Sequence, residues 1–292
     1  MPVNLYQDEL ESLLHEDMSS VLSRERDAFD EMLAAVGNRV VLFGAGNLGC
    51  KALGCLRSIG IEPLAFADSD PSRWGTKASD VPVLSPQTSA DDFGRSALFV
   101  VTIWRHGHTF RETRRQLETL GCVNVVPSAA LRWKFSRDLL PDFCQDLPHK
   151  VYSETEAVIE ASDLWSDDLS RRQYLDQVRW RTVGDYDNLN LSVIKEAYFL
   201  DNLFSLSSEE VFIDCGAYDG DTSRTLIQRQ NGSVGNIVAI EPDPANFRRL
   251  SSWMTELDSQ LANKIEAFNV AIGAERGITR FNATGMADAS IV

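Results

Sequence analysis

Hydrophobic residues recur at two spacings along the chain, and the changes between them predict alternating helices and strands. Over 5–33, apolar residues return every three to four positions opposite a charged face, which is typical of one or two amphipathic helices. Short apolar runs at 39–43, 63–67, 97–103 and 123–126 are typical of buried parallel strands. We expect the N-terminal helices to pack on this first α/β domain, although they are also suited to a dimer contact.

The stretch 209–250 repeats the strand–turn–helix–strand pattern and organises the second half of the chain. An apolar run, Val211–Asp214, ends in an acid and leads into a glycine-bearing turn, after which Asp221 or Thr222 is predicted to cap a helix. A second apolar run ends in Glu241-Pro-Asp-Pro, where the prolines stop the strand and open the next helix. Ligands of open α/β sheets bind at such carboxyl ends of strands.

The residues at these two strand ends suit a nucleoside that carries positive charge. Glu241 is placed to accept hydrogen bonds from both hydroxyls of a ribose. Gly216 and Gly220 allow the backbone to approach a ligand closely. Asp214 and the acids of the turn repel a pyrophosphate but tolerate a cation such as S-adenosylmethionine. This hypothesis fails if Asp214 and Glu241 lie on opposite faces of the sheet with no shared cavity. The alternative interpretation is a Rossmann-like turn whose acids are only helix caps.

The same residues carry a family resemblance. VFIDCGAYDGDTS followed by AIEPDPANFRRL resembles the opening of the FkbM-type S-adenosylmethionine-dependent methyltransferases, over about 209–292. The resemblance implies a seven-stranded doubly wound sheet, with Glu241 holding the ribose. The residues that it implies for the methionine end are Asp214, Gly216, Ala217, Tyr218 and Gly220. We expect further cofactor contacts from Asp221, Pro242 and Asp243, with Asp219 in a lesser role. No catalytic base is named.

These patterns predict two Rossmann-like doubly wound α/β domains joined by a helical segment. The predicted parts are N-terminal helices at 1–35, a nucleotide-binding-type domain at 36–140, a helical connector or cap at 141–205 and a methyltransferase domain at 206–292. A complete domain of that family would continue with the strand and loop that face the acceptor. We therefore expect the second domain to be incomplete at its C-terminal end.

A second candidate nucleotide site follows the first predicted strand. Gly44-Ala-Gly46-Asn47-Leu-Gly49 is a GxGxxG motif between a strand and a helix, and Asp68 ends the next strand where an acid meets a ribose. NAD or a nucleotide-sugar is the candidate ligand; the alternative is an unliganded domain kept for structure or assembly. The surrounding segment more loosely resembles the N-terminal nucleotide-sugar-binding domains of some sugar-modifying acyltransferases.

Composition narrows the function classes. The formal net charge of −15 over 292 residues argues against a nucleic-acid substrate, since phosphate binding relies on Lys and Arg. The apolar runs are too short to cross a membrane, and the acidic N-terminus lacks a signal-peptide pattern, so a cytoplasmic location is expected. His106 and His108 lack the neighbours of a metal site. The cysteines are scattered without a CxxC pair and are expected to be reduced thiols: Cys50, Cys55, Cys122, Cys144 and Cys215.

Methyl transfer from S-adenosylmethionine, at an oxygen of a small or carbohydrate-like acceptor, is the leading functional hypothesis, and a homo-oligomer is an open prediction. One alternative is an NAD- or nucleotide-sugar-dependent sugar-modifying enzyme centred on the first domain. The other is a non-catalytic protein with two binding modules.

Overall fold

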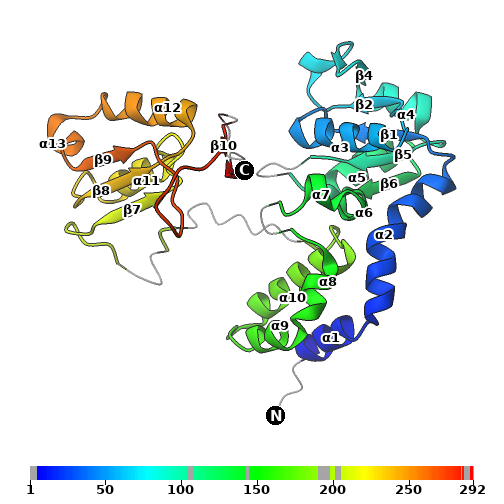
Figure 1. The fold of residues 1–292 in the computed structure, drawn as a ribbon, viewed down its shortest axis with the longest axis horizontal. Helices are drawn as coiled ribbons and strands as arrows, with labels where there is room; N and C mark the ends of the chain where they lie inside the picture. Colours follow the sequence, from blue (N-terminus) through cyan, green and yellow to red (C-terminus); the bar gives the residue numbers. More distant parts are fainter. Residues whose placement is uncertain are drawn as a thin grey trace. The chain divides into compact units, whose positions relative to one another are not determined.

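A computed structural model shows that the chain folds as two compact units, 1–193 and 194–292 (Figure 1). The structure describes residues 5–103, 108–142, 145–189, 198–200, 205–283, 285 and 290–291. The predicted class, an α/β protein with two Rossmann-like units, is confirmed. The division falls at 193/194, whereas the sequence suggested a helical connector that extends to residue 205.

Unit 1 is built around a six-stranded sheet in the order β3-β4-β2-β1-β5-β6. All paired strands run parallel except β3, which pairs antiparallel with β4 at the edge. The central strands β1 and β5 are apolar and buried along their whole length because both faces of the sheet are covered. The strands are β1 (Val40–Phe43), β2 (Ala65–Ala67), β3 (Lys77–Ala78), β4 (Val81–Leu84), β5 (Leu98–Val101) and β6 (Asn124–Pro127).

Helices cover both faces of this sheet, as the predicted doubly wound fold requires. Leu42 points to the face that packs on α2, α3, α6 and α7, and Phe43 points to the face that packs on α4 and α5. The helices of these layers are α2 (Met18–Ala35), α3 (Asn47–Ser58), α4 (Pro86–Phe93), α5 (Phe110–Thr119), α6 (Ala129–Lys134) and α7 (Ser136–Leu139), and a short 3-10 helix η1 (Pro71–Arg73) follows β2.

Unit 1 also has a helical part, in which the N-terminal helices pack against helices of the segment after β6. Leu10 and Leu14 of α1 and Val21 of α2 share one buried cluster with Leu175 and Val178 of α10. As predicted, α2 packs on the first α/β domain, through Phe29 and Leu33, whereas α1 packs on α10, which belongs to the predicted connector or cap. The remaining helices are α1 (Leu5–Leu14), α8 (Pro148–Ser153), α9 (Thr155–Ser162) and α10 (Asp168–Val183).

Unit 2 contains a parallel sheet in the order β7-β8-β9 and a short antiparallel pair, β10 with β11. One face of the parallel sheet packs on α11 and α12 through Leu226, Ile237, Ala239 and Leu250. The elements are β7 (Phe212–Cys215), α11 (Asp221–Arg229), β8 (Ile237–Ile240), α12 (Pro244–Met254), α13 (Ser259–Ala262), β9 (Ile265–Phe268), β10 (Phe281–Asn282) and β11 (Ser290–Ile291).

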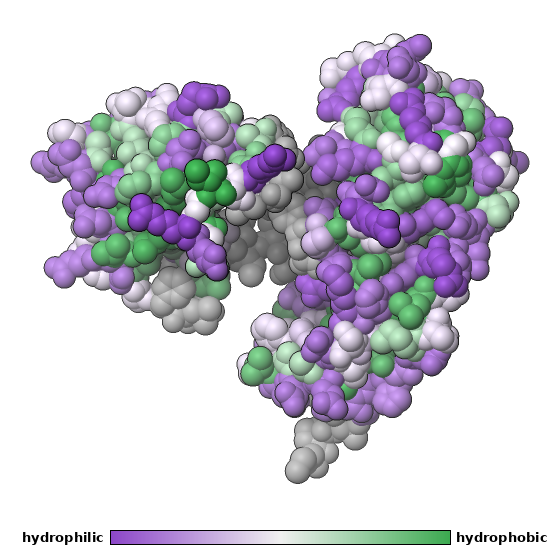
Figure 2. All heavy atoms as spheres, in the orientation of Figure 1, coloured by the Kyte–Doolittle hydropathy of each residue, from purple (hydrophilic) through white to green (hydrophobic). Residues whose placement is uncertain are grey.

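Side chains that point to the opposite face of this sheet remain in contact with solvent. Ile213 of β7 is 58% exposed and Phe268 of β9 is 45% exposed. In Figure 2, apolar residues of unit 2 lie in view among hydrophilic ones. Among the residues that the structure describes, no helix is long and apolar enough to cross a membrane.

Candidate cofactor site

The carboxylates of Asp214 and Glu241 lie on the same face of the unit 2 sheet. Asp214 of β7 is in register with Ala239 of β8, and Glu241 stands two positions beyond Ala239, so alternation turns both side chains to one face. Both are almost fully buried, with 9% of Asp214 and 5% of Glu241 exposed. The two side chains therefore do not lie on opposite faces of the sheet, the arrangement that would have contradicted the sequence hypothesis.

Glu241 ties the glycine turn to its own strand end. Its Oε2 accepts a hydrogen bond from the Tyr218 backbone N–H at 2.8 Å, and its Oε1 accepts one from the Asp243 N–H at 2.8 Å. The Asn246 side-chain amide also donates to Oε1, at 3.4 Å. A carboxylate offers about four lone-pair sites, so three bonds leave it acceptor capacity for a hydroxyl. Glu241 thus ties the turn to the strand end and keeps the acceptor capacity expected of a carboxylate that binds a ribose.

Asp214 is a buried acid in an electronegative setting. Burial raises its pKa, the hydrogen bond from the Ser223 hydroxyl at 3.2 Å opposes that rise, and the charges of Asp221 and Glu241 add to it. A cation placed among these three carboxylates would relieve their mutual repulsion. These three carboxylates therefore suit the positively charged ligand that the sequence predicted.

The turn between β7 and α11 depends on glycine at two points. Gly216 has a φ of +102° and Gly220 a φ of +90°, in the left-handed region that favours glycine. A Cβ at Gly220 would lie 2.7 Å from the Trp253 ring. Tyr218, also left-handed at +50°, holds its ring under the Arg249 guanidinium at 5.2 Å. Ala217 is buried against Ala239 and Leu250, so its side chain belongs to the core.

Asp219 and Asp221 of the turn contact groups of the protein itself, and neither is the N-cap residue of α11. The residue that precedes the first turn of α11 is Gly220, not Asp221 or Thr222, because its left-handed backbone already ends the turn and Asp221 begins the helix. The Asp221 carboxylate accepts from the Thr222 N–H at 2.9 Å. Asp219 forms an ion pair with Arg224 at 2.6 Å.

Asp243 is fully buried, and its carboxylate accepts hydrogen bonds from backbone N–H groups. Its Oδ1 accepts from the N–H groups of Ala245, at 2.7 Å, and Asn246, at 3.2 Å, which caps α12, and its Oδ2 accepts from the Gly285 N–H at 2.7 Å. Pro242 lies between the two acids, and its carbonyl accepts from the Asn269 side-chain amide at 3.0 Å. The prediction that Asp243 and Pro242 contact a cofactor remains a prediction, but the Asp243 carboxylate is engaged by three amides.

Sequence reasoning missed two asparagines that brace this loop. Asn246, 2% exposed, donates to Glu241 and accepts from Arg249. Asn269, just after β9, donates to the carbonyl oxygens of Glu241, at 2.8 Å, and Pro242. The position of Asn269 at the end of the third parallel strand was the available signal, because strand ends meet at one edge of a sheet.

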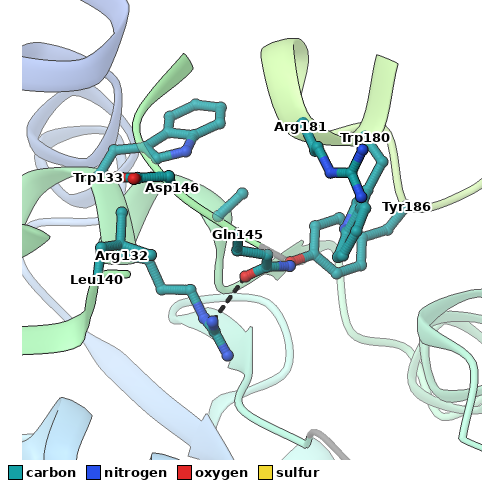
Figure 3. A pocket seen from close by; sticks show the side chains of 9 residues that line it. Arg132, Trp133, Leu140, Gln145, Asp146, Trp180, Arg181 and Tyr186 are labelled. Atoms are coloured by element: carbon teal, nitrogen blue, oxygen red, sulfur yellow. Dashed lines mark hydrogen bonds between the residues drawn. The ribbon is translucent and has the colours of Figure 1, made fainter. Parts of the chain in front are cut away.

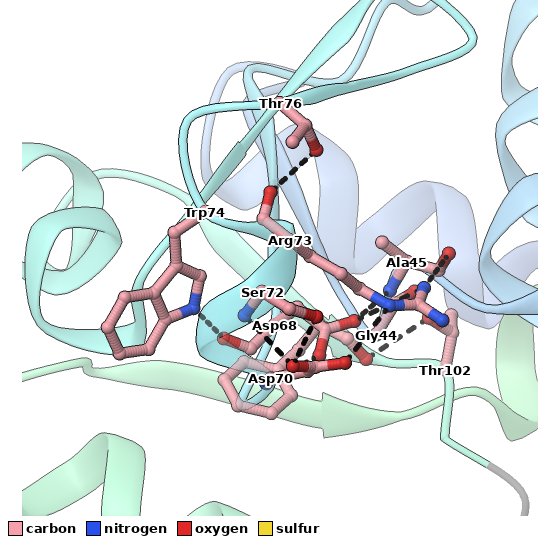
Figure 4. Close-up of polar contacts among 10 residues, drawn as sticks. Gly44, Ala45, Asp68, Asp70, Ser72, Arg73, Trp74, Thr76 and Thr102 are labelled. Carbon is pink, nitrogen blue, oxygen red and sulfur yellow. Dashed lines mark hydrogen bonds and ion pairs between the residues drawn. The ribbon is translucent and has the colours of Figure 1, made fainter.

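The predicted site residues of unit 1 also come together at the ends of β1 and β2 (Figure 4). Asp68 accepts from the Ala45 N–H at 2.9 Å and from the Asp70 N–H at 2.9 Å. Gly44 and Gly46 flank Ala45 in the turn. Gly49 and the exposed Asn47 lie in the first turn of α3.

A cavity in unit 1 is lined by neither the Gly44–Gly49 turn nor Asp68 (Figure 3). Its free volume is only about 10 Å³, room for about one water molecule, so it is not a ligand pocket. Its polar groups bond to one another: the buried Arg132 guanidinium donates to Gln145, whose amide donates to the Tyr186 hydroxyl. Trp133, Trp180 and Arg181 complete most of the lining. We interpret it as a packing feature of the helical part.

Among the described residues, the histidines and cysteines considered as candidates form no metal-binding cluster. His108 contacts the Thr113 hydroxyl at 2.8 Å, and His106 lies outside the described residues. Over the described parts of the chain, no group of three or more His, Cys, Asp or Glu side chains is placed to hold a metal. The described cysteines, Cys50, Cys55, Cys122 and Cys215, are free thiols, and Cys144 lies outside the described residues.

The comparison of the chain with protein families bears on unit 2. The family described as "Methyltransferase FkbM domain" matches residues 214–291, from the buried Asp214 to the last described strand. Unit 2 carries an FkbM methyltransferase domain. Family and fold together support a methyltransferase. No curated protein matches the chain in sequence.

Among solved structures, the methyltransferase FkbM from Methylobacillus flagellatus KT is similar to nearly the whole chain. It is 17% identical, with a TM-score of 0.70 over 95% of this chain and 75% of that one, a likeness that shows the fold alone. UDP-D-quinovosamine 4-dehydrogenase from Vibrio fischeri is 23% identical over 30% of this chain and 75% of that one, with a TM-score of 0.25. RSP in complex with beta-NADH is 20% identical over 35% of this chain and 52% of that one, with a TM-score of 0.26. At these last two TM-scores, neither likeness bears on function.

Proposed function

We propose that the FkbM domain transfers a methyl group from S-adenosylmethionine to an oxygen of a small or carbohydrate-like acceptor. The observation that supports this most is the buried carboxylate of Glu241, hydrogen-bonded to the Tyr218 N–H of the glycine turn at 2.8 Å. The family match at 214–291 supplies the reaction class. The acidic surroundings of Asp214 favour a donor that carries a sulfonium and an ammonium.

The residues of the chain would bind and orient the donor. Glu241 would accept hydrogen bonds from the ribose hydroxyls, and the left-handed Gly216 would let the backbone approach the methionine end. Bound S-adenosylmethionine supplies an electrophilic methyl group on a positively charged sulfur. The protein's contribution to such a displacement is mainly alignment of the acceptor oxygen, methyl carbon and sulfur.

Calorimetric titration of the full chain with S-adenosylmethionine tests the proposal. We expect wild-type protein to bind, and Glu241→Gln to weaken binding by about ten- to hundredfold, because one acceptor oxygen becomes a donor amide facing the ribose hydroxyls. Glu266→Gln is the matched control, since Glu266 is an exposed acid of β9 that takes no part in the proposed site.

Thermal unfolding of both variants separates loss of binding from loss of structure. Glu241→Gln also affects the bonds to Tyr218 and Asp243, so its titration is interpreted at a temperature where the variant is folded. Absence of binding by wild-type protein, or equal affinity of a folded Glu241→Gln variant, would refute the proposal.

A further inference from the structure

The Glu241 carboxylate accepts hydrogen bonds from two groups outside its own strand end. Its Oε2 accepts from the Tyr218 N–H, in the turn after β7, and its Oε1 accepts from the buried Asn246 amide, in the first turn of α12. The carboxylate presents its remaining lone pairs in one direction only while these donors stay in place. The groups that fix Tyr218 and Asn246 therefore bear on how Glu241 would meet a ribose.

Arg249 contacts both of these residues. It stands three residues after Asn246 on α12, a spacing that brings side chains together on one helix face, and its Nη2 donates to the Asn246 Oδ1. Its guanidinium also lies over the Tyr218 ring, 5.2 Å from the ring centroid, within the range of a cation–π contact. No ion pair joins Arg249 to Glu241 among the described residues, so Arg249 acts on the carboxylate through Tyr218 and Asn246.

Arg249 also determines which way the Asn246 amide faces. A guanidinium only donates hydrogen bonds, and an ionised carboxylate only accepts them. Because Asn246 lies between the two, its oxygen has to face Arg249 and its NH2 group has to face Glu241, as the structure has them. Without Arg249, a flip of the amide would turn its oxygen toward Oε1 of Glu241, and two acceptors would face each other. The guanidinium thus selects the amide orientation that favours the ionised Glu241.

A third contact of Arg249 reaches the C-terminal part of unit 2. Its Nη2 donates to the Gly285 carbonyl at 2.8 Å, and the N–H of the same glycine donates to Asp243 at 2.7 Å. One cation therefore ties together the glycine turn, the start of α12 and Gly285. The sequence alone does not distinguish Arg249 from Arg248, the adjacent residue of the same type.

We propose that Arg249 is a positioning residue of the methyl-donor site, which orients Glu241 toward the ribose hydroxyls through Asn246 and Tyr218. The inference rests on the proposed function, in which Glu241 binds the ribose, and it adds the residue that keeps this carboxylate in its binding orientation. Arg249 itself touches neither the ribose nor the reacting atoms in this arrangement. Its loss should therefore reduce recognition of the ribose hydroxyls rather than binding of the rest of the donor.

Calorimetric titration of the full chain with S-adenosylmethionine and with its 2′-deoxy analogue tests this role. We expect wild-type protein to prefer the ribose form by about ten- to hundredfold, since the analogue lacks a hydroxyl that bonds to a charged acceptor. Arg249→Ala should reduce this ratio of affinities by at least about threefold, because the Asn246 amide is then free to flip, and Glu241→Gln should reduce it as well. A general loosening of the fold would weaken both ligands equally and leave the ratio unchanged.

Arg248→Ala is the matched control, because it removes the same charged group at the adjacent, exposed position of α12. It should keep the wild-type ratio of affinities. Hydrogen exchange of the unliganded chain adds a measurement that needs no donor. The peptide that contains Tyr218 should exchange at least about threefold faster in Arg249→Ala and at the wild-type rate in Arg248→Ala.

The outcomes separate this inference from the proposed function. If wild-type protein binds no S-adenosylmethionine, the proposed function is wrong, and the exchange at Tyr218 decides whether Arg249 positions the Glu241 carboxylate. The inference about Arg249 is wrong if wild-type protein binds the donor without preferring the ribose form, or if Arg249→Ala keeps the wild-type ratio. Equal effects of the Arg248 and Arg249 substitutions, on the ratio or on the exchange at Tyr218, would also overturn it.

Discussion

Asp243 offers the sharpest test of how the loop after β8 is held, because its carboxylate accepts hydrogen bonds from three backbone N–H groups of the described residues. Asp243→Ala removes the cap of α12 and the acceptor of the Gly285 N–H. Losing a helix cap costs about 0.5–2 kcal/mol, and losing a hydrogen bond to a charged acceptor costs about 1.5–3 kcal/mol. We expect local stability of the loop to fall by about 2–5 kcal/mol.

Asp243→Ser separates the two contributions. Serine caps helices nearly as well as aspartate but is one atom shorter and carries no charge, so it should restore the cap and leave Gly285 without its acceptor. Hydrogen exchange of the full chain, followed by mass spectrometry on peptides that contain Ala245, Asn246 or Gly285, measures this directly. The Ala variant should exchange about 30- to 5,000-fold faster in all of them, and the Ser variant mainly at Gly285.

Acidity tests the same contacts without a mutation. Burial raises the pKa of Asp243, but the amides of Gly285, Asn246 and Ala245 outweigh it and hold the pKa below the usual range. The stabilisation is therefore present above the unfolded pKa, near 3.9, and is lost as the pH falls through the lowered folded pKa. Protection, corrected for intrinsic exchange, should be level from about pH 5 to 7 and decline only in stronger acid.

One result would refute this reasoning about Asp243. If Asp243→Ala lost affinity for S-adenosylmethionine while the three amides kept wild-type protection, the carboxylate would be a ligand contact, as the sequence first suggested. If Asp243→Ala still binds S-adenosylmethionine at saturating concentration while its amides exchange faster, the result supports the structural role.

Two further substitutions probe the acids and glycines of the two turns. Asp214→Asn should stabilise unit 2 by on the order of 1 kcal/mol at neutral pH, since it removes a buried charge, while weakening donor binding. Because the folded pKa of Asp214 is raised, the gain seen in thermal unfolding should vanish as the pH falls below the unfolded pKa; a gain that persists there contradicts the assignment. Gly49→Ala should destabilise unit 1 by about 3 kcal/mol or more, as its Cβ would meet the Gly44 carbonyl at 2.0 Å. Calorimetric unfolding that leaves the unit 1 transition unchanged would show that the turn relaxes.

Local patterns were enough to predict most elements near the sites. The apolar run ending at Asp214 became β7, and Pro244 opened α12 as its fixed φ and missing N–H predict. Helix capping was less predictable. Asp221 was expected to cap α11, but the left-handed Gly220 takes that position, because the path of the turn, and not capping preference, decides which residue precedes the helix.

The sequence by itself determined that acids end the second strand of each unit beside a glycine turn, because strand patterning and proline stops act over a few residues. Only the tertiary structure decided which acids remain able to bind a ligand. Register placed Asp214 and Glu241 on one face, and long-range contacts engaged Asp243 with Gly285. The close contact that a Cβ at Gly49 would make with Phe66, at 3.2 Å, likewise depends on an atom distant in the chain, because a glycine motif alone does not reveal what surrounds a missing side chain.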